Sequence, residues 1–184
     1  MSYYIPKPGD VTEPPVINKW PARLNQVFNK VPTIIACAFT ETTWGFEVTQ
    51  SDRENGRTLV EEHFKLLLDH VILDEVNSSP DVLITMEDIR KCFQIFLKEL
   101  YEWTSKELEK VVQRRLQDMK VEYLFSVPAT WKERTVCDYQ AIIKRAGFGS
   151  IDGHTAKIAL NEAEAAAVQT AIYNSHLETD GYNV

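Results

Sequence analysis

VEYLFSV, residues 121–127, is the clearest strand in the chain and decides the fold class. Apolar side chains fall on both faces of this segment, as they do in a strand that is buried within a sheet. Pro128 ends the strand, because proline has no backbone N–H group to donate to a neighbouring strand. We therefore expect a buried strand that leads directly into the next element.

A helix is predicted immediately after this strand. Thr130 and Glu133 have the spacing of a capping box, which predicts a helix that begins there and runs to about Arg145. Gly147 suits the position just beyond a helix, where a left-handed backbone is common.

A second strand and a last helix follow in the same order. KIAL, residues 157–160, is a short predicted strand, and a helix is expected over residues 163–173. Because strand and helix alternate, residues 121–173 are predicted to form a parallel α/β layer. Residues 174–184 have no apolar pattern and are expected to be a tail.

Before residue 121, the pattern of apolar residues first predicts short strands and then helices. VPTIIACAF (31–39) and WGFEV (44–48) are β-branched and aromatic, which predicts two short strands joined by a polar turn. In TLVEEHFKLLLDHVI (58–72), apolar residues recur at three- and four-residue steps, which predicts a helix.

The most periodic segment lies next. It predicts one long amphipathic helix, or two in tandem, from about residue 86 to 119. Thr85 and Asp88 have the spacing of a helix start. We expect residues 31–120 to form one subdomain beside the sheet subdomain of residues 121–173.

Residues 1–30 carry five of the eight prolines of the chain. Proline fixes φ and removes a hydrogen-bond donor, so an extended arm is expected here rather than a packed element.

Composition narrows the possible functions. Apolar residues make up 44% and charged residues 26% of the 184 positions, which is typical of a globular protein, and the net charge of -7 argues against nucleic-acid binding. The longest apolar run, residues 34–39, is too short to span a membrane. Three widely spaced cysteines without a CxxC pair fit a reducing compartment, so we expect a cytoplasmic or nuclear protein.

Two carboxylates in LNEAEAAAV, residues 160–168, are candidate functional groups. Residues two apart on a helix point about 200° from each other, so Glu162 and Glu164 cannot act on the same ligand from one regular helix. Glu164 has the spacing to form a capping box with Asn161. Glu162 lies at the carboxyl tip of a predicted strand, where it either orients a water or metal-bound ligand or only begins the helix.

Lys65, in the apolar stretch FKLLLD, is the third candidate. A lysine in this setting either extends its ammonium group into solvent or reaches a phosphate. Other common motifs are absent: GFGSIDG (147–153) lacks the GxGxxG spacing, and there is no GxSxG or HExxH.

Six segments in sequence order resemble the actin-like ATPase domain of the seventy-kilodalton heat shock protein family, particularly its divergent fungal members. They are KVPTIIACAF, WGFEV, FKLLLD, VEYLFSVPATW, AGFG and LNEAEAAAV, and they extend from about Trp20 to Ala171. The resemblance implies a partial ribonuclease H-like fold that comprises the first lobe only. It also implies a chaperone that uses ATP and magnesium.

The resemblance implies roles for two residues. In the family, a lysine and a glutamate in an N-E-P-T-A-A-A segment position the water that attacks the γ-phosphate of ATP. Lys65 and Glu162 fall on these two positions. The proline and threonine that follow the glutamate in the family are Ala163 and Glu164 in this chain.

The phosphate-binding loops of the family have no counterpart here. The chain contains no D-x-G and no two adjacent glycines, and the second lobe is also missing. Phosphoryl transfer depends on binding and positioning the phosphates, so no ATP hydrolysis is expected from this chain alone.

We therefore expect a fragment or degenerate family member that acts through a protein partner or through the missing second lobe. One alternative is a working ATPase whose phosphate loops are missing from this chain or come from another. The other alternative is an interaction module that does not depend on nucleotide.

Overall fold

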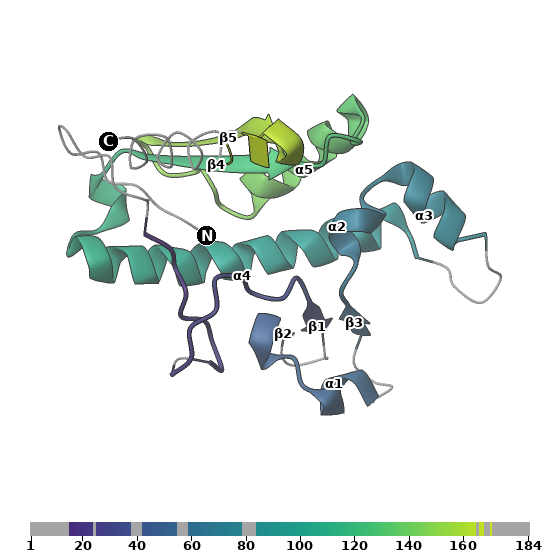
Figure 1. The fold of residues 1–184 in the computed structure, drawn as a ribbon, viewed down its shortest axis with the longest axis horizontal. Helices are drawn as coiled ribbons and strands as arrows, with labels where there is room; N and C mark the ends of the chain where they lie inside the picture. Colours follow the sequence, from purple (N-terminus) through teal and green to yellow (C-terminus); the bar gives the residue numbers. More distant parts are fainter. Residues whose placement is uncertain are drawn as a thin grey trace, which may run out of the picture.

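The computed structural model describes residues 15–23, 25–37, 42–54, 59–78, 84–164, 166–167 and 170. These residues form a mixed α/β structure in which a long helix, α4 (Met86–Val112), runs between two small sheets (Figure 1). One sheet has three antiparallel strands, and the other has two parallel strands with a helix of their own. The expected α/β class is confirmed.

Helix α4 begins where the sequence predicts. Thr85 is its N-cap residue, and the side chains of Thr85 and Asp88 each accept a hydrogen bond from the other's backbone N–H. The helix ends at Val112 rather than near residue 119. Gln113 has a φ of 52°, and this left-handed conformation stops the helix.

The predicted strand–helix–strand unit is present, and it consists of β4 (Val121–Val127), α5 (Glu133–Arg145) and β5 (His154–Asn161). Val121 lies opposite His154 and Val127 opposite Asn161, so the two strands are parallel. The strand at residues 121–127 and the parallel layer are confirmed, but the expectation that this strand is buried on both faces is wrong, since Leu124 is 62% exposed. The second strand is longer than the predicted residues 157–160.

The start of α5 differs from the prediction. Its N-cap residue is Lys132, and no side chain caps the helix. A turn precedes it, in which the Trp131 N–H donates to the Pro128 carbonyl at 3.1 Å. The turn moves the helix start beyond Thr130, so the predicted capping box does not form. Gly147, with a φ of 108°, follows the helix as predicted.

The antiparallel sheet contains β1 (Ile35–Cys37), β2 (Thr42–Trp44) and β3 (Leu59–Glu61), in the order β2-β1-β3. The second strand was predicted at residues 44–48 and lies earlier, because Gly45, with a φ of 58°, turns the chain into a 3-10 helix (Gly45–Glu47). A Cβ atom on Gly45 would lie 2.6 Å from Cγ2 of Val31, so both backbone and space require glycine. A short helix, α1 (Gln50–Glu54), follows.

The helix predicted over residues 58–72 is wrong. The segment divides into β3, α2 (Phe64–Leu67) and α3 (His70–Val76). Residues 59–61 pair with β1, which holds them in an extended conformation. Asp69 then interrupts the helical pattern, since its extended backbone and its side chain, which accepts from the Val71 N–H at 3.1 Å, begin α3 anew.

Part of the N-terminal segment is packed. Ile17 and Trp20 are buried in the core, and the indole N–H of Trp20 donates to the Phe28 carbonyl at 2.7 Å. The expectation of an unpacked arm over residues 1–30 is wrong for this part, because the prolines prevent helix and strand but leave the aromatic side chain able to bury. Residues 1–14 and the predicted tail, residues 174–184, lie outside the described residues.

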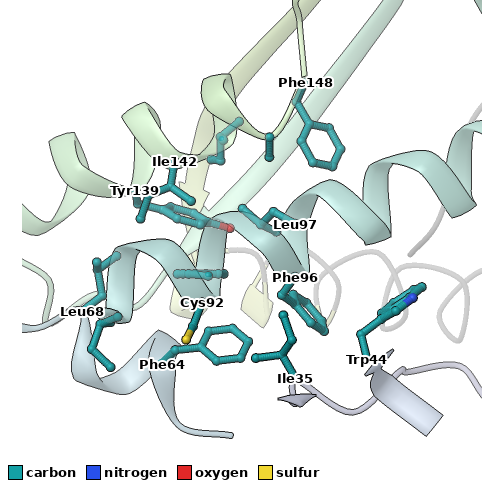
Figure 2. Close-up of a cluster of buried hydrophobic side chains, with 14 of the residues drawn as sticks. Ile35, Trp44, Phe64, Leu68, Cys92, Phe96, Leu97, Tyr139, Ile142 and Phe148 are labelled. Atoms are coloured by element: carbon teal, nitrogen blue, oxygen red, sulfur yellow. The ribbon is translucent and has the colours of Figure 1, made fainter. Parts of the chain in front are cut away.

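One core joins both sides of α4 (Figure 2). The ring centroid of Phe93, on α4, is 5.1 Å from that of Phe64 and 5.2 Å from that of Tyr139. Phe96 faces Phe64 and Trp44 on the side of the antiparallel sheet. The two predicted subdomains therefore share a single hydrophobic interior.

Trp20→Ala tests whether the N-terminal segment belongs to this core. Removing a fully buried indole leaves a cavity and should lower the free energy of unfolding by about 3–5 kcal/mol in urea denaturation. Val27→Ala is the matched control in the same segment, because Val27 is 66% exposed and its truncation should change stability by less than about 0.5 kcal/mol. Equally small effects of both substitutions would show that the segment does not pack.

Candidate functional site

Lys65 lies on α2, at the surface. Phe64, Leu67 and Leu68 are buried and anchor this short helix to the core. Lys65 occupies the opposite side of the turn, and its side chain keeps 36% of its exposure. The apolar residues of FKLLL therefore position the lysine without enclosing it.

Glu162 directly follows β5, at the carboxyl end of the parallel strand pair. Next to it, the Glu164 N–H donates to Oδ1 of Asn161 at 2.8 Å, and the Asn161 N–H donates to Oε2 of Glu164 at 2.9 Å. This reciprocal cap confirms the predicted role of Glu164. Glu162 takes no part in the cap, so its carboxylate is left for another contact.

The fold brings the two predicted site residues together. Nζ of Lys65 donates to Oε1 of Glu162 at 2.6 Å, although the residues are 97 positions apart in the sequence. The side chains are 36% and 50% exposed, and an ion pair this exposed contributes roughly 0–1 kcal/mol to stability. The contact is therefore a result of how α2 and β5 are placed rather than the cause of their placement.

A second charged cluster braces the elements around this pair. Asp138 on α5 accepts from Nη2 of Arg90 on α4, with its two oxygens at 3.0 and 2.9 Å, and lies 3.4 Å from Nε2 of His70 on α3. The cluster links α3, which follows α2, to α5, which precedes β5. It thereby positions the elements that carry Lys65 and Glu162.

Sequence reasoning missed this cluster. His70, Arg90 and Asp138 come from three different helices and have no local spacing that marks them as partners. Only the tertiary packing of the three helices brings them together.

Tyr139, on α5, is a buried residue whose hydroxyl responds to the charge of Glu162. Burial raises the pKa of its hydroxyl above the ordinary value, and the nearby negative charge of Glu162 raises that pKa further. The ring packs edge-on against Trp131, with the centroids 5.4 Å apart. A protonated hydroxyl in an aromatic setting therefore lies within the field of the Glu162 carboxylate.

This arrangement does not fit magnesium and ATP as a whole. Lys65 offers one cation for a phosphate oxygen, and Glu162 offers one carboxylate that can orient a water, but the two groups already bind each other. Within the described residues, no three His, Cys, Asp or Glu side chains gather into a metal-binding group. Without a glycine-rich turn, the pair alone cannot hold a triphosphate.

Comparisons with known proteins give no match to a family model, to a curated protein or to a solved structure. In the part of the chain that the structure describes, none of the helices combines the length and apolar character needed to cross a bilayer. The assignment of the site therefore rests on the motifs and on the geometry of Lys65 and Glu162.

Two substitutions test whether each ion pair stabilises the fold: Glu162→Gln for the Lys65–Glu162 pair and Asp138→Asn for the Arg90–Asp138 pair. Glu162→Gln should change the free energy of unfolding by less than about 1 kcal/mol, because the pair is exposed. Asp138→Asn removes the charge from a mostly buried pair and should cost about 1.5–3 kcal/mol. Urea denaturation measures both. A cost for Glu162→Gln as large as that for Asp138→Asn would assign Glu162 a structural role.

Proposed function

We propose that this chain is a partial or degenerate member of the seventy-kilodalton heat shock protein family, carrying the first lobe of the actin-like ATPase fold. It acts through protein contact and does not hydrolyse ATP unaided. The observation that carries the proposal is the 2.6 Å contact between Lys65 and Glu162. Both residues were candidates from their place in the sequence and from the motif resemblance, before any contact between them was known, and they lie 97 positions apart.

The position of the pair also supports the proposal. Glu162 lies at the carboxyl end of β4 and β5, where open parallel α/β sheets place their ligands. Lys65 reaches this edge from the other side of the core, on the helix that follows the antiparallel sheet. Cys37, Cys92 and Cys137 are free thiols, which suits the reducing cytoplasm.

Protein contact is favoured by the uncovered face of the parallel sheet. Helix α5 packs against one face, whereas Leu124 on the opposite face of β4 is 62% exposed. Ala163, Ala166 and Ala167, which follow β5, are also exposed. Parallel sheets in folded proteins are normally covered on both faces, so a second polypeptide that completes the layer is the partner we infer.

Retention of both water-positioning residues favours a second candidate function. In this case the phosphate loops come from another polypeptide, and Lys65 and Glu162 act once those loops hold the nucleotide. A search of the genomic DNA on either side of the coding sequence tests the family assignment itself. A D-x-G-T segment upstream and a Gly-Gly turn downstream would support the family assignment and would place the phosphate loops in the same gene rather than in another polypeptide.

Calorimetric titration of the isolated chain with magnesium and ATP tests the absence of unaided catalysis. One lysine that is already paired supplies too few contacts, so any affinity should be weaker than about 1 mM, or about 4 kcal/mol of binding free energy. A parallel phosphate-release assay should show no turnover. Tight binding that Lys65→Met abolishes would refute the proposal and establish the ATPase candidate.

Light scattering during gel filtration tests the uncovered face. The chain alone should self-associate, because Leu124 is a large apolar side chain exposed on the uncovered face of β4. Leu124→Lys should shift the chain towards monomer, whereas Val27→Lys, a matched charge at another exposed position, should not. A monodisperse monomer that melts cooperatively without any substitution would contradict this prediction.

A further inference from the structure

A hollow of about 260 Å³ lies between α5 and β5, in the parallel layer at the top of Figure 1. Its lining comes from the second half of α5, the loop that follows α5 and residues 156–158 of β5. None of the lining residues belongs to β4, to the Lys65–Glu162 pair or to the cluster around Asp138. The hollow is therefore separate from the proposed site and from the uncovered face of β4.

The hollow reaches the outer edge of β5. Successive residues of a strand point to opposite faces of the sheet, so a hollow on one face would touch only every second residue. This hollow touches Ala156, Lys157 and Ile158 in succession. Because the inner edge of β5 pairs with β4, contact with all three residues places the hollow at the edge that faces away from β4.

This outer edge is free of other strands within the described residues, where the parallel sheet consists of β4 and β5 only. An edge strand presents N–H and C=O groups that can pair with another strand. The register with β4 is regular from His154 to Ile158, and Ala159 is the extra residue of a bulge. The regular part of the free edge therefore includes the three residues that line the hollow.

The floor of the hollow is apolar. Ile143 on α5 and Phe148 in the following loop are buried and line it, together with Ile158, which is partly buried. A strand placed beside β5 would direct alternate side chains towards the α5 face of the sheet, where this floor lies. The floor therefore accepts an apolar side chain from an added strand.

Two lysines flank the hollow, and none of its lining residues carries a carboxylate. Lys144 is exposed on α5. Lys157 pairs with Glu122 on the uncovered face of the sheet, yet its side chain remains 61% exposed. An ion pair this exposed is weak, so Lys157 is available to the carboxylate of a ligand. This edge is therefore positively charged, although the net charge of the chain is -7.

We propose that the outer edge of β5 binds an extended acidic segment of another protein as an added strand. Main-chain hydrogen bonds join the segment to residues 154–158, an apolar side chain enters the hollow, and neighbouring carboxylates meet Lys157 or Lys144. This inference goes beyond the proposed function, in which the partner covers the face of β4 that carries Leu124.

Other occupants fit less well. A second copy of this chain that paired edge to edge would place lysines near lysines, and like charges across a strand pair are destabilising. A helix satisfies its own backbone groups and would leave those of β5 without partners. A basic segment would be repelled by Lys144 and Lys157. The combination of a free edge, an apolar floor and two lysines favours an acidic strand.

Three heptapeptides with blocked ends test the proposal by calorimetry on the full chain. Thr-Val-Glu-Val-Glu-Val-Thr should bind saturably, with a Kd of about 1 mM or tighter. The same peptide with lysine in place of glutamate should bind at least about tenfold more weakly, because like charges meet. The glutamate peptide with methylated interior amide nitrogens should be weakened as much, because it has lost its main-chain donors.

Two results would overturn the proposal. One is the absence of saturable binding by the glutamate peptide, and the other is equal binding by this peptide and either of the other two. Light scattering of Leu124→Lys tests the uncovered face of β4 independently. Failure of the peptides would therefore remove the edge site and leave the proposed function in place.

Hydrogen exchange followed by NMR locates the bound peptide. The glutamate peptide should slow amide exchange within residues 154–158, because an added strand accepts hydrogen bonds from the outward N–H groups of β5. Slower exchange confined to other elements would contradict the assignment to this edge.

Charge reversal tests the two lysines. Lys144→Glu combined with Lys157→Glu should reverse the preference, so that the lysine peptide binds at least about tenfold more tightly than the glutamate peptide. Lys91→Glu combined with Lys98→Glu is the matched control on α4, because both lysines are exposed and lie outside the lining, and it should keep the original preference. Reversal by the control, or no reversal by the first variant, would refute the proposal. If the first variant fails to fold, the methylated peptide still decides the question.

Discussion

Packing of α4 against both sheets is the constraint on which the rest of the structure depends. Phe93 contacts Phe64 on one side and Tyr139 on the other, so a single residue of α4 ties the antiparallel layer to the parallel one. Protein interiors are close-packed, and α4 therefore cannot shift without moving α2 and α5. Hydrophobic burial and the cluster around Asp138 bring Lys65 and Glu162 together, rather than the attraction between these two side chains themselves.

The Lys65–Glu162 pair and the cluster around Asp138 have different roles. Arg90 and Asp138 are about three-quarters buried or more, and they hold helices in register. Lys65 and Glu162 are more exposed, and water or a ligand can reach both. An anion that approached Lys65 would compete with Glu162, which would release the carboxylate. An exposed ion pair that a rigid core holds in place suits a site where a ligand replaces one member of the pair. A mostly buried ion pair suits a structural role.

The sequence by itself determined the elements whose signals are local. The strand at residues 121–127, the start of α4 and the Asn161–Glu164 cap follow from a short apolar run, helical periodicity and side-chain capping within a few residues. Lys65 and Glu162 were chosen from a motif resemblance, but their contact required the fold. Only the tertiary structure divided residues 58–72 into strand and helices, buried Trp20 and assembled the cluster around Asp138. These features depend on backbone pairing and burial between distant segments, and the free energy of such contacts outweighs local propensity.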